Sequence, residues 1–431
     1  MPVTVRRVPV VPTDVRVDRR FLGAARTSCA PPPPDPSAPI RPVPLLVASA
    51  LAVLVTAAVA VTHGAREGVY LALGLLLGMA LFHSRFGFAS AWQRLVAVGN
   101  GQGLRAQALL LGTAATAVAA ISAGGLGLFG AVPHAQAGSL GVPLLLGAAL
   151  FGVGMQLAGS CASGTLFAVG SGQSTIVPAL GGFVAGAVFC TWLMPLLDRL
   201  PQTGGVLLAD HIGWFGSWAI TALALLGVVA ATLVVQHRRN PPPVVPPPTA
   251  HGLARLYRGS WSVFAGAIVL GLLAGVVFLV SGQVWGVTGA YSLWGAKILQ
   301  LFGAHPEHWP FWREGEQAAA LAGSVLADRT SLTNIGIVLG AAVAAAAAST
   351  WRLHSRVAWR TALAALLGGF LMGVGSRMSG GCNIGALLGG ISSGSLHGWI
   401  WGVCALCGAW LGVRCRPLFG LTNPKSDDGV C

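Results

Sequence analysis

The sequence predicts an all-α polytopic membrane protein with about ten transmembrane helices, short re-entrant half-helices and two inverted-topology repeats. Only 9% of its 431 residues are charged, and no Lys, Arg, Asp or Glu occurs from Ala106 to Leu197. A charge-free run of that length has room for several helical spans of about 20 residues. Its Ala, Leu, Val and Gly runs show no apolar–polar alternation, which excludes a membrane-spanning β-barrel. Helices that cross a bilayer are therefore expected.

An internal repeat is the second observation. Residues 145–164 and 366–385 match at ten of twenty positions with a constant offset of 221. The matching pairs are Leu145/Leu366, Leu146/Leu367, Gly147/Gly368, Leu150/Leu371, Gly152/Gly373, Val153/Val374, Gly154/Gly375, Gly159/Gly380, Cys161/Cys382 and Gly164/Gly385. Shared apolar composition does not explain a cysteine in register with a glycine on either side. We therefore infer two copies of one unit, each placing a thiol at a Gly-flanked helix break.

Apolar runs separated by charged turns predict the spans in order. They are expected at residues 45–62, 68–82, 106–123, 142–158, 176–196, 214–235, 261–280, 331–349, 361–378 and 396–413. The uncharged polar segment after Cys161 favours a re-entrant pair of half-helices, because membranes tolerate such backbone only inside protein. Residues 83–105 are expected to form a cytoplasmic loop with a short helix, to which 285–299 aligns. Residues 303–330 are expected to lie outside the membrane.

These features divide the chain into five parts. They are a disordered basic N-terminal tail (1–44), a first membrane half with repeat 1 (45–236), a Pro-rich basic cytoplasmic linker (237–259), a second membrane half with repeat 2 (260–413) and a C-terminal tail (414–431). The distribution of Arg and Lys predicts that both termini and the linker are cytoplasmic. The Cys161 break then lies at the cytoplasmic end of its span and the Cys382 break at the outer end. The two copies are therefore inverted, which is typical of transport proteins.

Composition and motif content argue against several other classes. The net charge of +14 would suggest nucleic-acid binding in a soluble chain, but here the basic residues lie at span ends and in tails. They are explained by membrane orientation and by the head groups of the lipid bilayer, so no nucleic-acid partner is expected. No Walker A motif and no His/Cys/carboxylate cluster with metal-ligand spacing occurs in the sequence. We expect no cofactor, no metal and no catalytic residues.

The two cysteine units are the candidate substrate-binding and translocation site. Their residues are Cys161, Cys382, Gly159, Gly164, Gly380, Gly381, Gly385 and Arg377. Glycine lets a substrate approach the backbone closely, and a broken helix aims N–H groups inward, which favours an anion. Burial disfavours a charged thiolate, so neutral S–H groups that donate weakly to a soft acceptor such as sulfur are expected. The alternative is that both cysteines are small buried apolar groups in a helix-packing seam.

Arg377 is the one charged residue between Arg360 and Arg414. An ionisable side chain inside a membrane is a functional candidate, here for attracting an anion. The alternative is a side chain that extends to the outer interface. Two further sets of residues are expected at membrane interfaces, namely His397 and the tryptophans Trp92, Trp294, Trp399 and Trp401.

The segments GSRMSGGCNIGALLGG (375–390) and GMQLAGSCASG (154–164) resemble the YeeE/YedE sulphur-transport family of bacterial inner-membrane proteins. The segment WGVTGAYSLWGAKIL (285–299) looks like that family's second-half motif, and the resemblance extends from about residue 68 to 413. It implies a multi-pass protein of the cell inner membrane that takes up thiosulfate or a related sulfur species. It also implies that cysteine thiols relay the substrate, at positions matched here by Cys161 and Cys382.

One position departs from this family pattern. Several relatives carry a further cysteine after an Arg-Phe pair early in the first half, whereas Arg85-Phe86 is followed here by Gly87. Other sulfur anions, selenium compounds and other inorganic anions therefore stay open as substrates. Two alternatives from other classes also stay open. One is a membrane redox component that modifies a sulfur species, and the other is a docking platform for a cytoplasmic sulfur-carrier protein.

Overall fold

The computed structural model describes residues 39–241, 252–353 and 357–424. Within these ranges, ten helices are long and apolar enough to cross a membrane. The only strands in the described parts are β1 (Leu140–Gly141) and β2 (Gln202–Thr203), which pair with each other. The prediction of an all-α polytopic membrane protein is confirmed.

The helices follow one another in two series that resemble each other. The first series is α1 (Pro42–Thr62), α2 (Ala65–Ser84), α3 (Phe88–Val98), α4 (Gln102–Ala123), α5 (Val142–Ala158), α6 (Ala162–Gly170), the 3-10 turn η2 (Ser174–Ile176) and α7 (Val177–Leu197). The second is α8 (Leu208–Arg239), α9 (Ala254–Arg258), α10 (Val263–Ser281), α11 (Thr288–Leu301), α12 (Gly315–Ala322), α13 (Arg329–Ala347), α14 (Trp359–Met378), the π-helical η6 (Asn383–Leu388), α15 (Gly389–Ser392) and α16 (Leu396–Cys415).

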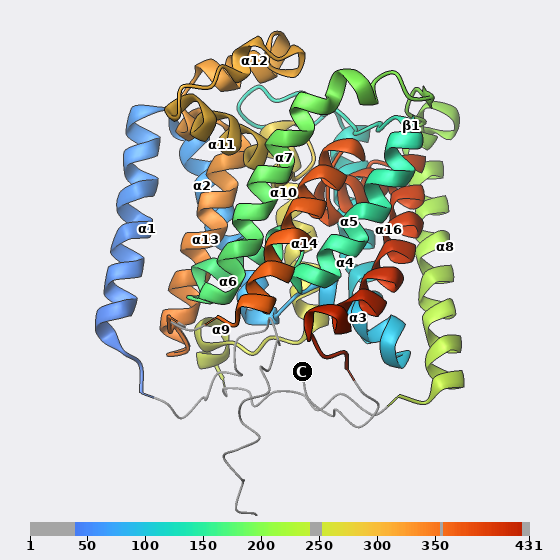
Figure 1. Cartoon of the computed structure of the whole chain (residues 1–431), viewed down its shortest axis with the longest axis horizontal. Coiled ribbons are helices and arrows are strands. Elements are labelled where there is room, and N and C mark those ends of the chain that lie inside the picture. Colours follow the sequence, from blue (N-terminus) through green and yellow to red (C-terminus); the bar gives the residue numbers. More distant parts are fainter. Residues whose placement is uncertain (1–38, 242–251, 354–356, 425–431) are drawn as a thin grey trace, which may run out of the picture.

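Helices α5 and α14, which carry the internal repeat, pack together in antiparallel directions near the middle of the bundle (Figure 1). Gly147 faces the backbone of Gly375, and Gly154 faces the backbone of Gly368. In the repeat, Gly147 corresponds to Gly368 and Gly154 to Gly375. Exchanging the two copies of the repeat therefore converts one contact into the other. Reciprocal contacts of this kind are what an approximate two-fold axis between inverted repeats requires.

The surrounding helices follow the same symmetry. Helix α16 packs on α5 as α7 packs on α14, and α10 packs on α4 as α13 packs on α2. Small residues allow these close crossings, for example where Gly78 meets the backbone of Ile337 and where Gly275 meets Ala117. Without a hydrophobic force between helices in lipid, such close backbone packing supplies much of the attraction.

Helices α1 and α8 form opposite edges of the bundle (Figure 1). In the apolar stretch of each span, only 11% of the residues of α1 and 17% of those of α8 are buried inside the protein, against 67% for the span Ala65–Val98, which includes α2, and for α13. Their exposed Leu and Val side chains are suited to contact with lipid tails. Helices α2 and α13, by contrast, are mostly covered by protein, and both cysteines of the repeat are buried.

Three predicted terminal and linker segments lie partly outside the described residues. Of the tail predicted for 1–44, the structure describes only 39–44, and α1 begins at Pro42. Residues 242–251 of the predicted linker and 425–431 of the predicted C-terminal tail are likewise outside the described ranges.

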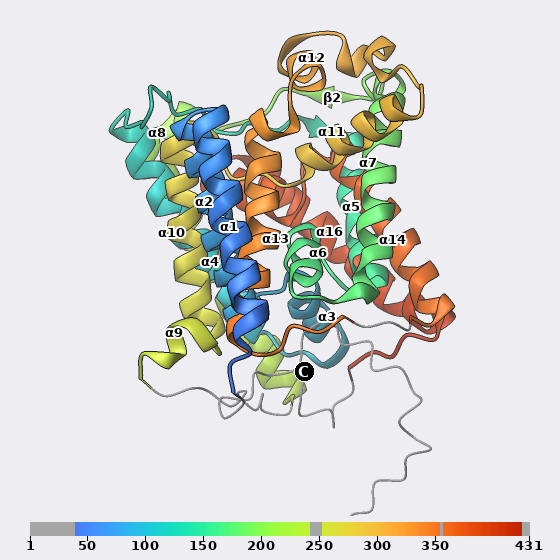
Figure 2. The ribbon, with the colours of Figure 1, turned by 90° about the vertical axis from the view of Figure 1, so that its left-hand side faces the viewer.

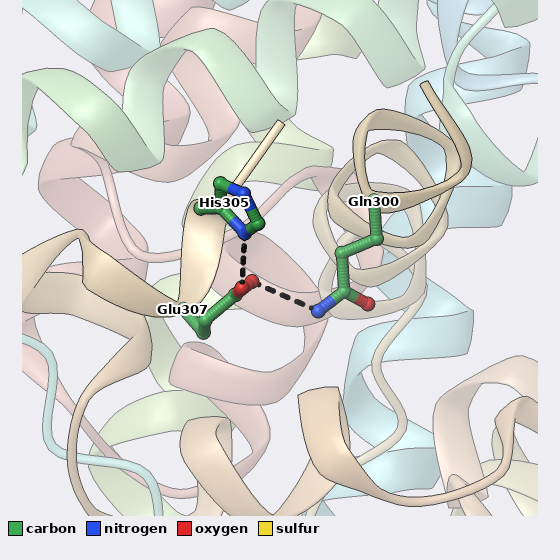
Figure 3. Close-up of polar contacts among 3 residues, drawn as sticks. All are labelled: Gln300, His305 and Glu307. Carbon is green, nitrogen blue, oxygen red and sulfur yellow. Dashed lines mark hydrogen bonds and ion pairs between the residues drawn. The ribbon is translucent and has the colours of Figure 1, made fainter. Parts of the chain in front are cut away.

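Residues 303–328 form a cap of short helices, including α12, over one end of the bundle (Figure 2). We call this end the α12 end, and the opposite end, where α9 lies, the α9 end. A polar cluster ties the cap to α11: Gln300 donates to Glu307 Oε2 at 3.0 Å, and His305 Nδ1 lies 2.8 Å from Glu307 Oε1 (Figure 3). The Gln300 hydrogen bond, together with those from the Glu307 backbone and His305, lowers the pKa of Glu307 to about 2.

Candidate functional site

Cys161 occupies the junction between α5 and α6. It is the N-cap of α6, with an extended backbone, and its side chain is 2% exposed. The backbone N–H of Gly164 donates to Cys161 Sγ at 3.4 Å, and Ser163 Oγ lies 3.7 Å from the same sulfur. The sulfur thus takes the place of the side-chain oxygen that usually caps a helix.

Cys382 occupies the matching junction after α14. It is the N-cap of η6, its side chain is fully buried, and its Sγ accepts the backbone N–H of Ile384 at 3.4 Å. In both units the sulfur therefore accepts a backbone N–H, and Cys161 also has Ser163 Oγ at 3.7 Å as a donor or acceptor. The predicted equivalence of the two cysteines extends to their helix position and their hydrogen bonding.

Glycine is required where each long helix ends. Gly159 (φ 70°) and Gly380 (φ 71°) occupy the same place in the repeat and are both left-handed. Gly381 has φ 151°, and a Cβ there would lie 2.6 Å from the backbone nitrogen of Ala386. A side chain at any of these three positions would strain the turn that presents the cysteine.

Gly164 and Gly385, the last matched pair of site glycines, differ in their surroundings. A Cβ on Gly164 would lie 2.5 Å from Ser160 Oγ and 3.2 Å from Cys161 Sγ, so the first unit is filled. A Cβ on Gly385 would meet no atom within 4 Å. The second unit thus has open space beside its short helix, whereas the first does not.

Tyr291 of α11 joins the two units. Its ring is fully buried, and its hydroxyl donates to the carbonyl oxygen of Ala162, the residue after Cys161, at 3.0 Å. Cys161 and Cys382 both lie near Tyr291. The structure therefore brings the two predicted cysteines to one buried region, although 221 residues separate them in the chain.

The side chain of Arg377 contacts α11 and the cap and makes no hydrogen bond to either cysteine. Its Nη1 donates to Ser292 Oγ of α11 at 3.2 Å, and its guanidinium lies over the ring of Phe311 in the cap, 5.4 Å from the centroid. Its Nε is buried without a hydrogen-bond partner, and no ion pair to a carboxylate is formed in the described parts of the chain. Arg377 thus places a positive charge at the α12 end of α14 without direct contact to Cys382.

Two polar residues of this region were not predicted from the sequence. Tyr291 is one, and Asn383 is the other, because its side chain is 1% exposed and neither its amide nitrogen nor its amide oxygen has a hydrogen-bond partner. A polar side chain inside an otherwise apolar segment is a signal that could have identified Asn383. The Tyr291 contact depends on packing between distant segments, which no local pattern reveals.

Several expectations about the surroundings are wrong. Residues 83–105 contain the expected short helix, α3, but this helix packs on α4 and on α16, and the side chain of Trp92 is only 2% exposed. Trp92 donates to Gln107 at 2.7 Å inside the protein. Trp401 and His397 are also buried, at 0% and 1% exposed, so these three residues are not interface anchors. Trp401 donates to Ser379 Oγ at 2.9 Å, and His397 Nε2 lies 2.9 Å from the carbonyl oxygen of Ser379.

Gly87 is the N-cap of α3. This is the helix position that Cys161 and Cys382 occupy at α6 and η6. The position that the family resemblance singled out therefore lies at a third break of the same kind. Within the described ranges, no group of three or more His, Cys, Asp or Glu residues could hold a metal ion.

Comparison with known proteins identifies the family. A family model described as "Sulphur transport" matches residues 83–411, which is most of the chain and includes both cysteine units. The chain belongs to the sulphur transport family. With the ten apolar helices described above, it is a multi-pass membrane protein.

Relatives within the sulphur transport family carry transporter names. The "Thiosulfate transporter TsuA" of Spirochaeta thermophila is 25% identical over 350 residues, which cover 79% of this chain and 96% of that protein. The protein of the same name in Escherichia coli is 27% identical over 353 residues, covering 78% and 91%. The "Probable transporter YedE" of Escherichia coli is 32% identical, but the match spans only 36% of this chain and 37% of that protein's length.

Proposed function

We propose that this protein takes up a small sulfur-containing anion, thiosulfate or a related species, along a path lined by Cys161 and Cys382. The observation that carries the proposal is the pair of inverted thiols, each capping a short helix and both near Tyr291. Membership of the sulphur transport family and the similarity to proteins named thiosulfate transporters support it.

The chemistry of the site suits such a substrate. Each sulfur accepts a backbone N–H, and in the proposed path each S–H proton points to a passing anion, with Ser163 Oγ donating to Cys161 Sγ and not accepting from it. A thiol is a weak donor, and its weakness favours release as well as capture, which conduction along a path requires. The terminal sulfur of thiosulfate is a soft acceptor for which such a donor is well matched. Arg377, which lacks a carboxylate partner in the described ranges, adds an attraction for anions at the α12 end.

The orientation belongs to the same proposal. Basic side chains gather at the α9 end, where α8 ends with Arg238 and Arg239 and α9 contains Arg255 and Arg258. Acidic residues such as Glu307 and Glu316 lie in the cap at the α12 end. The positive-inside rule then places the α9 end and both termini in the cytoplasm, with the protein in the cell inner membrane. Uptake would run from the cap towards α9.

The substrate can be tested by growth and by uptake. Cells that lack their own sulfur-anion transporters and express this protein are expected to grow on thiosulfate as the sole sulfur source. Sulfite and sulfate serve as comparisons, and selenite sensitivity tests the selenium alternative. Growth on sulfate alone, or sensitivity to selenite without growth on thiosulfate, would assign a different anion.

The two alternative functions, a redox component and a docking platform, make separate predictions. A redox component would leave persulfide or disulfide on Cys161 or Cys382 during turnover, which mass spectrometry detects. A docking platform for a cytoplasmic sulfur-carrier protein would lose its partner when residues 237–259 are deleted. Uptake into vesicles of pure lipid and protein would show that such a carrier is an additional partner and not a requirement for transport.

Asn383 supplies a sharper test of the substrate path. A buried amide without partners costs about 1–3 kcal/mol per unsatisfied group, so we propose that it is retained because it contacts the substrate. Replacing Asn383 with Leu is expected to leave the Tm of the purified protein unchanged or higher, yet to reduce uptake at least about tenfold.

The matched control for this test is Asn334→Leu. Asn334 is fully buried as well, and its Oδ1 has no hydrogen-bond partner, but its Nδ2 donates to the carbonyl oxygen of Val287 at 2.9 Å. Its replacement is expected to lower the Tm, because a backbone carbonyl loses its partner. If Asn383→Leu lowers the Tm as much as Asn334→Leu, or leaves uptake intact, Asn383 has no role in binding the substrate.

A further inference from the structure

A row of four aromatic rings connects the two cysteine units through the centre of the protein. The row runs from Trp401 of α16 to Phe151 of α5, then to Phe183 of α7 and to Tyr291 of α11. The successive ring centroids are 5.4, 6.1 and 4.7 Å apart. All four side chains are fully buried. We call these residues the aromatic row.

Each end of the aromatic row is hydrogen-bonded to a different cysteine unit. Tyr291 donates its hydroxyl to the carbonyl oxygen of Ala162, next to Cys161, at 3.0 Å. Trp401 donates its ring N–H to Ser379 Oγ, three residues before Cys382, at 2.9 Å. The polar groups of the two outer rings thus attach the row to the two cysteine units by hydrogen bonds, and the two middle rings are entirely apolar.

The aromatic row also draws on both series of helices. Phe151 and Phe183 come from α5 and α7, whereas Tyr291 and Trp401 come from α11 and α16. A relative movement of the two inverted repeats would therefore change the ring contacts. In inverted-repeat transporters such movement is the usual source of alternating access.

We propose that the aromatic row is the closed gate of the transport path, with Tyr291 and Trp401 as the residues that latch it to the two cysteine units. This inference rests on the proposed transport function. A fully buried row of rings leaves no space for water, and an anion cannot cross a dry apolar constriction. Passage therefore requires a ring to move, and the hydroxyl of Tyr291 sets how readily it does so.

The gate can be tested without knowing the substrate. Purified protein is placed in sealed proteoliposomes, and the passive entry of iodide is followed with a trapped iodide-quenched dye. Phe183→Ala removes a middle ring and is expected to raise iodide permeability at least about tenfold above wild type. Tyr291→Phe keeps the ring but removes the latch, and we expect a smaller rise of about two- to fivefold.

The matched control is Phe278→Ala on α10. Phe278 is equally buried but lies outside the aromatic row, so its loss removes the same volume from the protein. Iodide permeability of this variant is expected to match wild type. Because Phe183→Ala could fail to fold, Phe183→Leu serves as the second variant, with a Tm measured for each.

The outcomes separate the gate from the proposed substrate. Wild-type iodide permeability in both Phe183 variants would overturn the proposed gate. An equal rise in iodide permeability in Phe278→Ala would also overturn it, because it would indicate a general loosening of the protein. Should the wild type fail to take up thiosulfate while Phe183→Ala still leaks iodide, the proposed substrate would be wrong and the gate would stand.

Discussion

Replacing Cys382 with alanine is expected to reduce the initial rate of thiosulfate uptake at least tenfold, a loss of about 1.4 kcal/mol or more. The change removes the S–H donor at the N-cap of η6 and leaves the backbone N–H of Ile384 without an acceptor. The same result is expected for Cys161→Ala, because the two thiols occupy equivalent positions. Uptake of radiolabelled thiosulfate into proteoliposomes measures both.

Cys407→Ala is the control for this prediction. Cys407 is a free, exposed cysteine on α16, so its loss should alter neither uptake nor stability. Serine at position 382 adds a second comparison, since its hydroxyl is a donor of similar size but harder and more strongly hydrated. An intermediate rate is expected for Cys382→Ser. Unchanged uptake in both alanine variants would remove the thiols from the mechanism.

Gly154→Ala is expected to destabilise the protein strongly, by about 3 kcal/mol. A Cβ at this position would collide with the carbonyl oxygen of Gly368 and would lie 2.8 Å from the backbone nitrogen of Met372. Since Gly154 lies at the crossing of the two repeats, the change pushes α5 and α14 apart. The Tm of the purified protein in detergent measures this effect, and uptake should fall with it.

Gly181→Ala is the matched control within α7. A Cβ on Gly181 would meet no atom within 4 Å, and the residue is exposed on the outside of the bundle. Alanine is a better helix former than glycine by about 1 kcal/mol, so this change should be neutral or stabilising. Equal Tm values for the two variants would show that the reciprocal glycine contacts do not hold the repeats together.

The main features of the fold could be predicted from the sequence because they depend on local patterns. Long apolar runs determine the helices, and the in-register Cys161 and Cys382 with their glycines reveal the repeat. The distribution of Arg indicates that its copies are inverted. These signals need no knowledge of which helix touches which.

Features that depend on packing between distant segments could not be predicted in this way. Trp92 and Trp401 have the composition of interface anchors, yet they lie in the core, where Gln107 and Ser379 accept their N–H groups. Tyr291 reaches Ala162 across 129 residues of sequence. Only the three-dimensional arrangement brings such partners together.

The most direct test of transport of the intact anion follows both sulfur atoms of thiosulfate. Proteoliposomes that contain only this protein are given thiosulfate labelled either at the terminal sulfur or at the oxygen-bearing sulfur. Transport of the intact anion predicts equal uptake of the two labels, with Cys161 and Cys382 recovered as free thiols. Two results would contradict transport of the intact anion. One is uptake of the terminal label alone, with a persulfide on either cysteine, and the other is uptake of neither label.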